Sequence, residues 1–255
     1  MIADFGHISV EVRGLVGRIR LAHPPLNILT IPMMREMSAA LEEMEARAEV
    51  SVVVFEGDAR AFSAGVDIAA HVPEQVHDML ASFHSVIRAV VASQKVSIAA
   101  VRGTCLGGGA ELALVCDMVY AARDATWGFP EIKLACYPPV AAVALAALVG
   151  QKRASELILT GRQISGDEAA AIGIATRSAR AEEVDGLVQQ TIDALSELSP
   201  TALGLAKKAL YGWDAIHFDK GLAKAEKIYL EELISTADAR EGIAAFLEKR
   251  RARWE

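Results

Sequence analysis

The sequence predicts an α/β fold in which helices pack on largely parallel sheets. Two observations lead to this prediction. Through the first half of the chain, short segments rich in β-branched residues alternate with segments of helical periodicity; after about Val140 the chain reads mostly helical, interrupted by glycines and by Pro200. The chain has 255 residues, of which 53% are hydrophobic. That length and composition suffice for one large core or two modest ones.

The individual elements are predicted from local patterns. Short apolar, β-branched runs that end at polar residues or glycine predict strands at residues 8–12, 16–21, 51–56, 97–101 and 118–121. The first two strands form a predicted hairpin, with Arg13 and Gly14 near its turn. Apolar residues at helical spacing or in longer runs predict helices at residues 32–48, 75–93, 140–149 and 239–253.

Two of the predicted helices have distinct signals. Met33, Met37 and Leu41 recur at helical spacing in residues 32–48, and Thr30 is suited to the N-cap because its hydroxyl can accept a hydrogen bond from the first turn. Residues 140–149 are apolar throughout, but a membrane span needs roughly 18 such residues or more. We therefore expect a buried helix there.

A domain boundary is predicted near residues 196–200, which divides a core of residues 1–198 from a helical region of residues 199–255.

Charge and cysteine content restrict the partners and the compartment. The chain has 26 Lys and Arg against 33 Asp and Glu, a formal net charge of −7. Such a surface gives no electrostatic footprint for nucleic acid or for an anionic membrane. The three cysteines have no CxxC spacing, so we expect reduced, buried thiols. The first residues lack the basic and apolar regions of a signal peptide, and a cytoplasmic protein is expected.

The segment with the most chemical information is residues 102–112, which follow a predicted strand and open a helix. Three consecutive glycines, Gly107 to Gly109, allow a ligand to approach the backbone closely. The first N–H groups of the helix have no partners within it and suit a developing negative charge. The alternative is a tight turn without a ligand. A phosphate loop is excluded because no lysine follows the glycines, and no GxGxxG motif occurs here.

Two further segments are informative only in combination. Residues 61–68 form a second glycine turn after a strand, in which Asp67 could also act only as a helix cap. Residues 125–132 place Glu131 among apolar and aromatic neighbours, and burial would raise the pKa of its carboxyl toward that of a general acid. The alternative readings are a solvated loop glutamate for Glu131 and a glutamate that only complements the helix dipole for Glu111.

Together the three segments resemble the motifs of the crotonase (enoyl-CoA hydratase/isomerase) superfamily. Its FxAGxD, GxxxGGGxEL and GxPE motifs match residues 62–67, 103–112 and 128–131, in the same order. The resemblance implies a spiral of ββα units followed by a C-terminal helical region that serves in trimerisation. It also implies a homotrimer or homohexamer that acts on an acyl-CoA substrate. Coenzyme A would be part of that substrate, and no metal or redox cofactor is implied.

The resemblance also implies roles for individual residues. Glu111 and Glu131 correspond to the catalytic acid/base pair of the hydratases, and the backbone N–H groups of Val66 and Gly108 correspond to an oxyanion hole for the thioester oxygen. Retention of both glutamates favours hydration over isomerisation alone. Further substrate contacts are implied for Ala64, Asp67, Ile68, Pro139 and Lys249. Lys249 could equally be a solvated lysine.

One departure from the family pattern concerns the substrate. Where many hydratases have a glycine-rich segment, this sequence has Pro138 and Pro139, and proline offers no N–H to a catalytic water. This variant looks most like the cyclohexa-1,5-dienecarbonyl-CoA hydratases of anaerobic aromatic degradation. The alternatives are a general short-chain enoyl-CoA hydratase or Δ-isomerase, and a non-catalytic RNA-binding homologue, against which the acidic charge and both glutamates argue.

Overall fold

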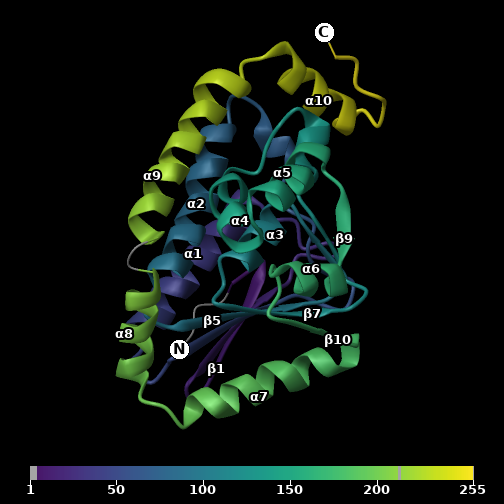
Figure 1. Ribbon diagram of the computed structural model, residues 1–255. Coiled ribbons are helices and arrows are strands. Elements are labelled where there is room, and N and C mark those ends of the chain that lie inside the picture. Colours follow the sequence, from purple (N-terminus) through teal and green to yellow (C-terminus); the bar gives the residue numbers. More distant parts are fainter. Residues whose placement is uncertain (1–4, 212–213, 255) are drawn as a thin grey trace.

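The computed structural model describes residues 5–211 and 214–254 and contains two sheets (Figure 1). The larger sheet has the strand order β1 (Ile8–Arg13), β2 (Val16–Leu21), β3 (Val52–Glu56), β5 (Val96–Val101), β7 (Met118–Ala122) and β10 (Arg177–Ala179). The smaller sheet has the order β4 (Ala61–Ser63), β6 (Thr104–Leu106), β8 (Thr126–Gly128) and β9 (Gln163–Ser165). The β1–β2 and β8–β9 pairs are antiparallel, and the other pairs are parallel.

The chain alternates between the two sheets. Strands β3, β5 and β7 of the larger sheet are each followed directly by β4, β6 and β8 of the smaller one. A helical segment then leads to the next pair of strands. This is the predicted spiral of ββα units, and the fold class is confirmed. Strand β3 is buried along its whole length, as expected for a parallel strand that is covered on both faces.

Helices cover both faces of the larger sheet (Figure 1). Those of the first part of the chain are α1 (Ile31–Ala46), η1 (Ile68–His71), α2 (Val76–Ala92), α3 (Gly108–Leu114), η2 (Pro130–Leu134), α4 (Pro139–Val149), α5 (Gln151–Thr160) and α6 (Gly166–Ile172). Those that follow are η3 (Ala181–Glu183), α7 (Val184–Ser196), α8 (Pro200–Tyr211), α9 (Asp214–Lys227), the π-helical turn η4 (Ile228–Leu233) and α10 (Ala237–Leu247). Helix α7 lies below the sheet in Figure 1, while α9 runs beside α2 and contacts α4.

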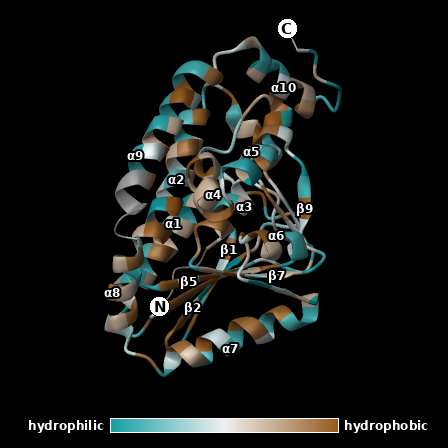
Figure 2. Cartoon of the chain, viewed as in Figure 1, coloured by the Kyte–Doolittle hydropathy of each residue, from teal (hydrophilic) through white to brown (hydrophobic). Residues whose placement is uncertain are grey.

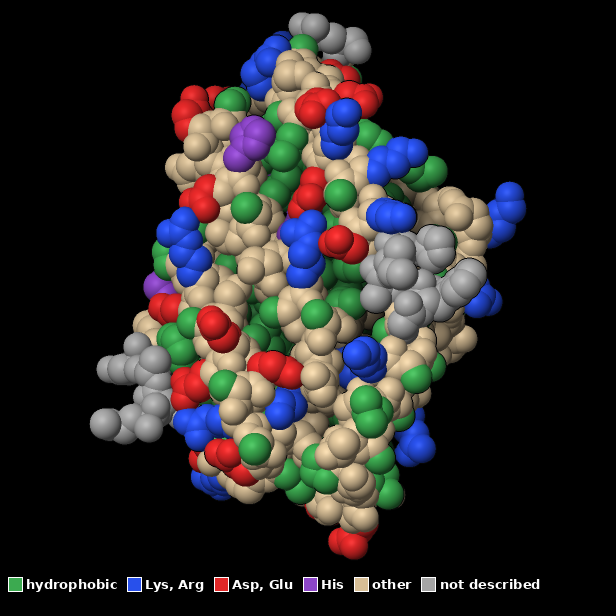
Figure 3. All heavy atoms as spheres, turned by 90° about the vertical axis from the view of Figure 1, so that its left-hand side faces the viewer, with side chains coloured by type: hydrophobic (Ala, Val, Ile, Leu, Met, Phe, Trp, Pro, Cys, Tyr) green, Lys and Arg blue, Asp and Glu red, His purple; other side chains and the backbone are tan. Residues whose placement is uncertain are grey.

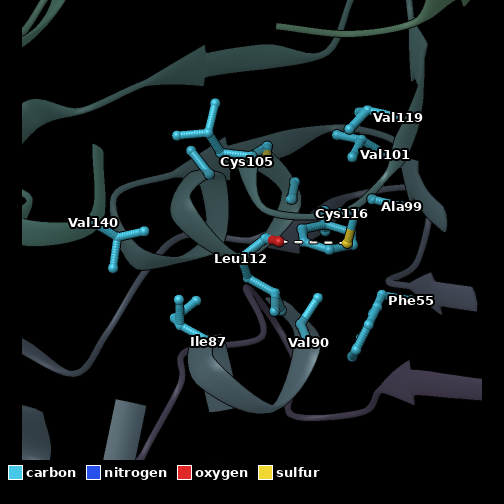
Figure 4. Packing of buried hydrophobic residues seen from close by; sticks show 14 of the residues in the cluster. Phe55, Ile87, Val90, Ala99, Val101, Cys105, Leu112, Cys116, Val119 and Val140 are labelled. Atoms are coloured by element: carbon cyan, nitrogen blue, oxygen red, sulfur yellow. Dashed lines mark hydrogen bonds between the residues drawn. The ribbon is translucent and has the colours of Figure 1, made fainter. Parts of the chain in front are cut away.

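The hydropathy of the elements matches their positions. In Figure 2 the strands of the larger sheet are mostly brown, whereas α7 and α9 alternate between brown and teal. This alternation is typical of helices that bury one face. Figure 4 shows part of the core around α3, where Cys116 donates a hydrogen bond of 3.4 Å to the carbonyl of Leu112. All three cysteines are buried and free, as predicted.

The hairpin and the first helix are confirmed, including the Thr30 cap, whose hydroxyl accepts a hydrogen bond from the Met33 N–H. The last helix, predicted to run to residue 253, ends at Leu247. Lys249 adopts a left-handed conformation with φ of 54°, and the N–H of Arg250 bonds back to the carbonyl of Ala245. This is a Schellman motif. The sequence does not predict it, because it lacks the glycine that usually occupies the left-handed position.

Helix α4 is only partly buried, which corrects the prediction for residues 140–149. Val140, Ala141, Leu145 and Val149 are buried, but Leu148 on the opposite face is 48% exposed. The apolar sequence predicts a buried helix, whereas the described residues of the chain cover only one face of α4. Within the described residues, no helix is long and apolar enough to cross a membrane.

The C-terminal helices are tied to the larger sheet by a buried ion pair. Lys207 on α8 lies 2.8 Å from the carboxylate of Asp117 and donates hydrogen bonds to the carbonyls of Val90 and Lys95. Asp117 also accepts hydrogen bonds from the backbone and the hydroxyl of Ser97 on β5. The break between α7 and α8 falls at the predicted boundary near residues 196–200, and the division into two domains stays a prediction.

Figure 3 shows the face that carries α8 and α9. Acidic and basic side chains alternate over the coloured part of this face, with apolar side chains between them. Charges of both signs are therefore interspersed on this side of the molecule.

Candidate active site

The candidate site lies where three parallel strands end. Strands β4, β6 and β8 run in the same direction, so their carboxyl ends meet at one edge of the smaller sheet. Residues 64–68 follow β4, residues 107–111 follow β6, and Pro130 and Glu131 follow β8. Residues from all three segments line one cavity of about 80 Å³. The three segments that the sequence singled out are thus brought together by sheet topology.

Val66 and Gly108 line this cavity from the two turns that follow β4 and β6. Leu29 bonds to the carbonyl of Gly65 and to the N–H of Asp67, which leaves the intervening N–H of Val66 without an acceptor among the described residues. Gly108 begins α3, where the first N–H groups have no intrahelical partner. The two turns touch, because a Cβ at Gly65 would lie 3.4 Å from the Gly108 nitrogen. Both predicted oxyanion donors therefore lie side by side.

The turn that carries Val66 is fixed by buried polar groups. The side chain of Asn27, 1% exposed, donates hydrogen bonds to the carbonyls of Ala61 and Phe62. The hydroxyl of Ser63 donates to the carbonyl of Asn27 and accepts from the N–H of Gly65. No pattern in the sequence indicates this bracing role of Asn27.

Glu111 connects the glycine turn to α4. Its side chain is 2% exposed, and Oε1 accepts hydrogen bonds of 2.8 Å and 2.9 Å from the N–H groups of Val140 and Ala141. These N–H groups belong to the first turn of α4, so Glu111 caps a second helix. Burial raises the pKa of Glu111 to about 7, and the two backbone hydrogen bonds oppose this shift. A carboxyl with this pKa exchanges protons near neutral pH.

Glu131 has a different environment. A Cβ at Gly107 would lie 2.8 Å from Oε1 of Glu131, so only glycine, which here has φ of 51°, leaves room for this carboxyl. Its other oxygen, Oε2, is buried and has no hydrogen-bond partner among the described residues. Burial, followed by the charge of Glu111, raises the pKa of Glu131 well above its ordinary value. The pair therefore shares its protons unequally, with Glu131 the more firmly protonated member.

The other predicted contacts divide into two groups. Ala64, Ile68 and Pro139 line the cavity. Asp67 does not, and its carboxylate instead caps η1 by accepting a hydrogen bond of 3.0 Å from Ala69. Lys249 is exposed after α10 and is not part of the cavity lining within this chain. Substrate binding by Asp67 and Lys249 stays a prediction.

Sequence reasoning missed several residues of the cavity wall. They are His71, Met79, Leu80, Phe83, Leu134, Cys136, Tyr137 and Tyr229. Tyr229 comes from η4, far along the chain from the three motifs, and no local pattern marks it. The contact of α10 with η2 completes this side of the site: Gly242 packs against Leu134, where a Cβ would lie 2.3 Å from the Leu134 carbonyl oxygen.

The arrangement suits the chemistry of an acyl group. Two neighbouring N–H donors can hold an oxygen that becomes negatively charged, and two carboxyls of unequal pKa can move protons in the same cavity. In residues 5–211 and 214–254, no cluster of three or more His, Cys, Asp or Glu side chains could hold a metal ion.

Known proteins have similar sequences. Residues 11–255 match the family model described as enoyl-CoA hydratase/isomerase. The chain is 36% identical over 249 residues to the cyclohexa-1,5-dienecarbonyl-CoA hydratase of Thauera aromatica, covering 97% of this chain and 96% of that protein. It is also 36% identical over 255 residues to a probable enoyl-CoA hydratase of Rhizobium meliloti (strain 1021), covering 97% of each chain.

Solved structures agree with these matches. An enoyl-CoA hydratase from Mycobacterium avium subsp. paratuberculosis K-10 superimposes with a TM-score of 0.90 at 26% identity, covering 99% of this chain and 100% of that one. One from Bacillus anthracis gives a TM-score of 0.79 at 32% identity, covering 98% of this chain and 99% of that one. With a family match over residues 11–255, relatives of 36% identity and solved structures of the same fold along nearly its whole length, the chain belongs to the enoyl-CoA hydratase/isomerase family and is an enzyme of hydratase type.

Proposed function

We propose that this enzyme adds water to cyclohexa-1,5-diene-1-carbonyl-CoA and forms 6-hydroxycyclohex-1-ene-1-carbonyl-CoA. The observation that carries the proposal is the placement of Glu111 and Glu131 in the cavity that the N–H groups of Val66 and Gly108 also line. Hydration needs both carboxyls, one to accept a proton from water and one to deliver a proton to carbon.

The reaction follows from the two environments. The thioester oxygen accepts hydrogen bonds from the N–H groups of Val66 and Gly108. Glu111, the more acidic of the pair, takes one proton from a water molecule as the water oxygen forms a bond to the β carbon. The π electrons of the Cα=Cβ bond move to the α carbon and the thioester oxygen, giving an enolate. Glu131 then donates its proton to a carbon of the conjugated system. One water molecule is thus added in total. Proton exchange afterwards restores both glutamates to their starting forms.

The cyclic substrate is supported by two observations. The relative from Thauera aromatica is named for hydration of this diene. The cavity walls are mostly apolar, with Met79, Leu80 and Phe83 of α2 on one side and Leu134 of η2 on the other, which suits the faces of a hydrocarbon ring. A general short-chain enoyl-CoA hydratase is the alternative, because other relatives of similar identity are named probable enoyl-CoA hydratases.

The test compares two substrates under the same conditions. We expect kcat/KM for the cyclic dienoyl-CoA to exceed that for crotonyl-CoA by at least about 10²-fold, which is about 2.7 kcal/mol of differential transition-state binding. Hydration of crotonyl-CoA at an equal or higher kcat/KM would contradict the cyclic substrate and would support the general hydratase. The absence of hydration of both thioesters would contradict hydration itself.

We also propose that the chain assembles as a homotrimer or homohexamer in the cytoplasm. Large apolar side chains of the C-terminal helices are exposed in the single chain, with Leu205 58% and Leu210 72% exposed on α8. Contact with a second copy would bury them. Light scattering should give three or six times the monomer mass; a monomer at micromolar concentration would contradict this proposal.

A further inference from the structure

The hydroxyl of Tyr229 is a buried polar group that the reaction described above does not use. Tyr229 is 1% exposed, and its ring belongs to the cavity wall. No described residue meets the geometry of a full hydrogen bond with Oη, and the Cys136 thiol, a weak donor and acceptor, lies close enough only for a marginal one. A buried hydroxyl without a partner is unfavourable, and it therefore points to a ligand.

The ring of Tyr229 is held firmly in place. It stacks edge-to-face against Tyr137 with 5.3 Å between ring centroids, and Tyr137 in turn donates a hydrogen bond of 2.5 Å to the carbonyl of Ala225. Tyr229 lies in the π-helical turn η4, and such turns occur frequently at functional sites. The ring of Tyr229 is thus fixed in place, whereas its hydroxyl can still form a hydrogen bond with a ligand.

Tyr229 lines the same cavity as Glu131, and the two groups interact electrostatically. Burial raises the pKa of Tyr229 well above its ordinary value, and Cys136 and Glu131 add to the shift. Tyr229 therefore stays protonated over the working range of the enzyme and can act as a donor. Its neighbour Glu131 has an unpartnered, buried Oε2.

A water molecule in this cavity needs such a donor. Ordered water usually makes about three hydrogen bonds, and the carboxylate of Glu111 can only accept them. The first residues of α4 offer no free backbone donor to this water. Pro139 has no N–H, and the N–H groups of Val140 and Ala141 are both bonded to Glu111. The hydroxyl of Tyr229 is a donor on the same cavity that remains available.

We propose that Tyr229 Oη donates a hydrogen bond to the oxygen that is added to the β carbon, first as water and then as the product hydroxyl. Tyr229 is therefore a positioning residue for the nucleophile. This inference rests on the proposed hydration, since it assigns a partner to the water of that reaction. It also assigns a role in the site to the C-terminal region of the chain, which the three motifs do not reach.

The test separates water addition from enolate formation. Tyr229→Phe keeps the ring and removes the hydroxyl. Tyr120→Phe is the matched control, because Tyr120 on β7 is also buried, its hydroxyl is hydrogen-bonded to Thr191, and it does not line the cavity. Two rates are measured for each protein: hydration of the unsaturated thioester, and exchange of the α-hydrogen of butyryl-CoA with deuterium from solvent. Exchange requires the oxyanion donors and a carboxyl, but no water added to carbon.

We expect Tyr229→Phe to lower kcat for hydration by about tenfold or more, the loss expected for one hydrogen bond in the transition state. KM should stay within about twofold, and the exchange rate should match that of the wild type. Tyr120→Phe should keep both rates. Hydration by Tyr229→Phe at the wild-type rate, or an equal loss of hydration and exchange, would overturn the inference. Failure of the proposed function is recognised separately, because the wild type itself would then hydrate neither thioester.

Discussion

Oε1 of Glu111 lies 2.8 Å from the backbone nitrogen of Val140, the second residue of α4, and a second N–H of the same helix shares that oxygen. The side chain of Glu111 thus caps the N-terminus of the helix beside it. The two hydrogen bonds favour the ionised form, whereas burial favours the neutral form, and the balance places the pKa of Glu111 at about 7. In the proposed reaction, the same carboxyl would move a proton and stabilise the start of α4.

Removal of either carboxyl should abolish most of the activity. We expect Glu111→Gln and Glu131→Gln each to lower kcat for hydration by more than about 10²-fold, the usual loss when a general acid or base is removed. Thioester affinity, measured by calorimetry, should change little. Glu42→Gln, on the exposed side of α1, is the control and should keep wild-type kinetics. Near wild-type turnover by either cavity variant would show that its carboxyl has no part in proton transfer.

Glu111 should also make the fold less stable at neutral pH than at acid pH. Its pKa is about 7 in the folded chain against an ordinary value of 4.5, so the folded state binds more protons between these values. Its contribution is present in full below about pH 4.5 and is lost as the pH rises through 7. Glu111→Gln keeps an oxygen for the cap without this cost.

The Tm of Glu111→Gln should therefore equal that of the wild type at pH 4 and exceed it by several degrees at pH 8. Thermal unfolding followed by circular dichroism at a series of pH values measures this difference. A variant that is less stable than the wild type at pH 8 would mean that the charged carboxylate, not the neutral carboxyl, is the stabilising form.

The oxyanion donor at Gly108 can be tested by comparing two substitutions that differ in whether they keep the backbone N–H. A Cβ at Gly108 would lie 2.6 Å from Cγ2 of Val66, so we place each substitution in a Val66→Ala background, which removes that methyl group and keeps the Val66 N–H. Val66→Ala with Gly108→Ala retains both donors. Val66→Ala with Gly108→Pro lacks the N–H donor of residue 108. It should still fold, because proline is tolerated at the first position of a helix.

We expect the proline variant to have at least about 10²-fold lower kcat than the alanine variant, the range found when one oxyanion donor is lost. Circular dichroism should show the same fold for both. Equal kcat values would mean that the Gly108 N–H does not bind the thioester oxygen. A severe defect of Val66→Ala alone would mean that the valine side chain matters more than its backbone.

The ion pair between Lys207 and Asp117 should be essential for stability. Lys207→Met leaves a carboxylate of low exposure without its charge partner, which we expect to lower the free energy of unfolding by roughly 3–5 kcal/mol. Adding Asp117→Asn should recover part of this loss. Arg180→Met, which breaks the exposed pair with Glu183, should change stability by less than about 1 kcal/mol. Urea unfolding measures all three; a small effect of Lys207→Met would show that Asp117 is satisfied by Ser97 alone.

The sequence predicted the parts of the site that depend on local geometry. A glycine turn between a strand and a helix has few conformations, so Gly108 and Glu111 could be placed from their spacing and from the family motifs. The hydrogen bond from Val140 to Glu111 spans 29 positions and depends on where α4 lies in space. Tyr229 depends on the packing of the C-terminal helices, and the end of α10 depends on a left-handed Lys249. Contacts of these kinds leave no periodic pattern in the sequence.

The close packing of Gly242 on Leu134 has a consequence for recombination between relatives. Helix α10 leaves no space for a side chain at this contact, and η2, which it supports, carries Glu131. The turn η4 just before α10 carries Tyr229. A chimaera that takes its last helices from another family member would thus inherit a new wall for the acyl pocket and a new support for Glu131. Libraries that seek altered acyl specificity should place the crossover before α9, so that this wall and its support come from a single parent.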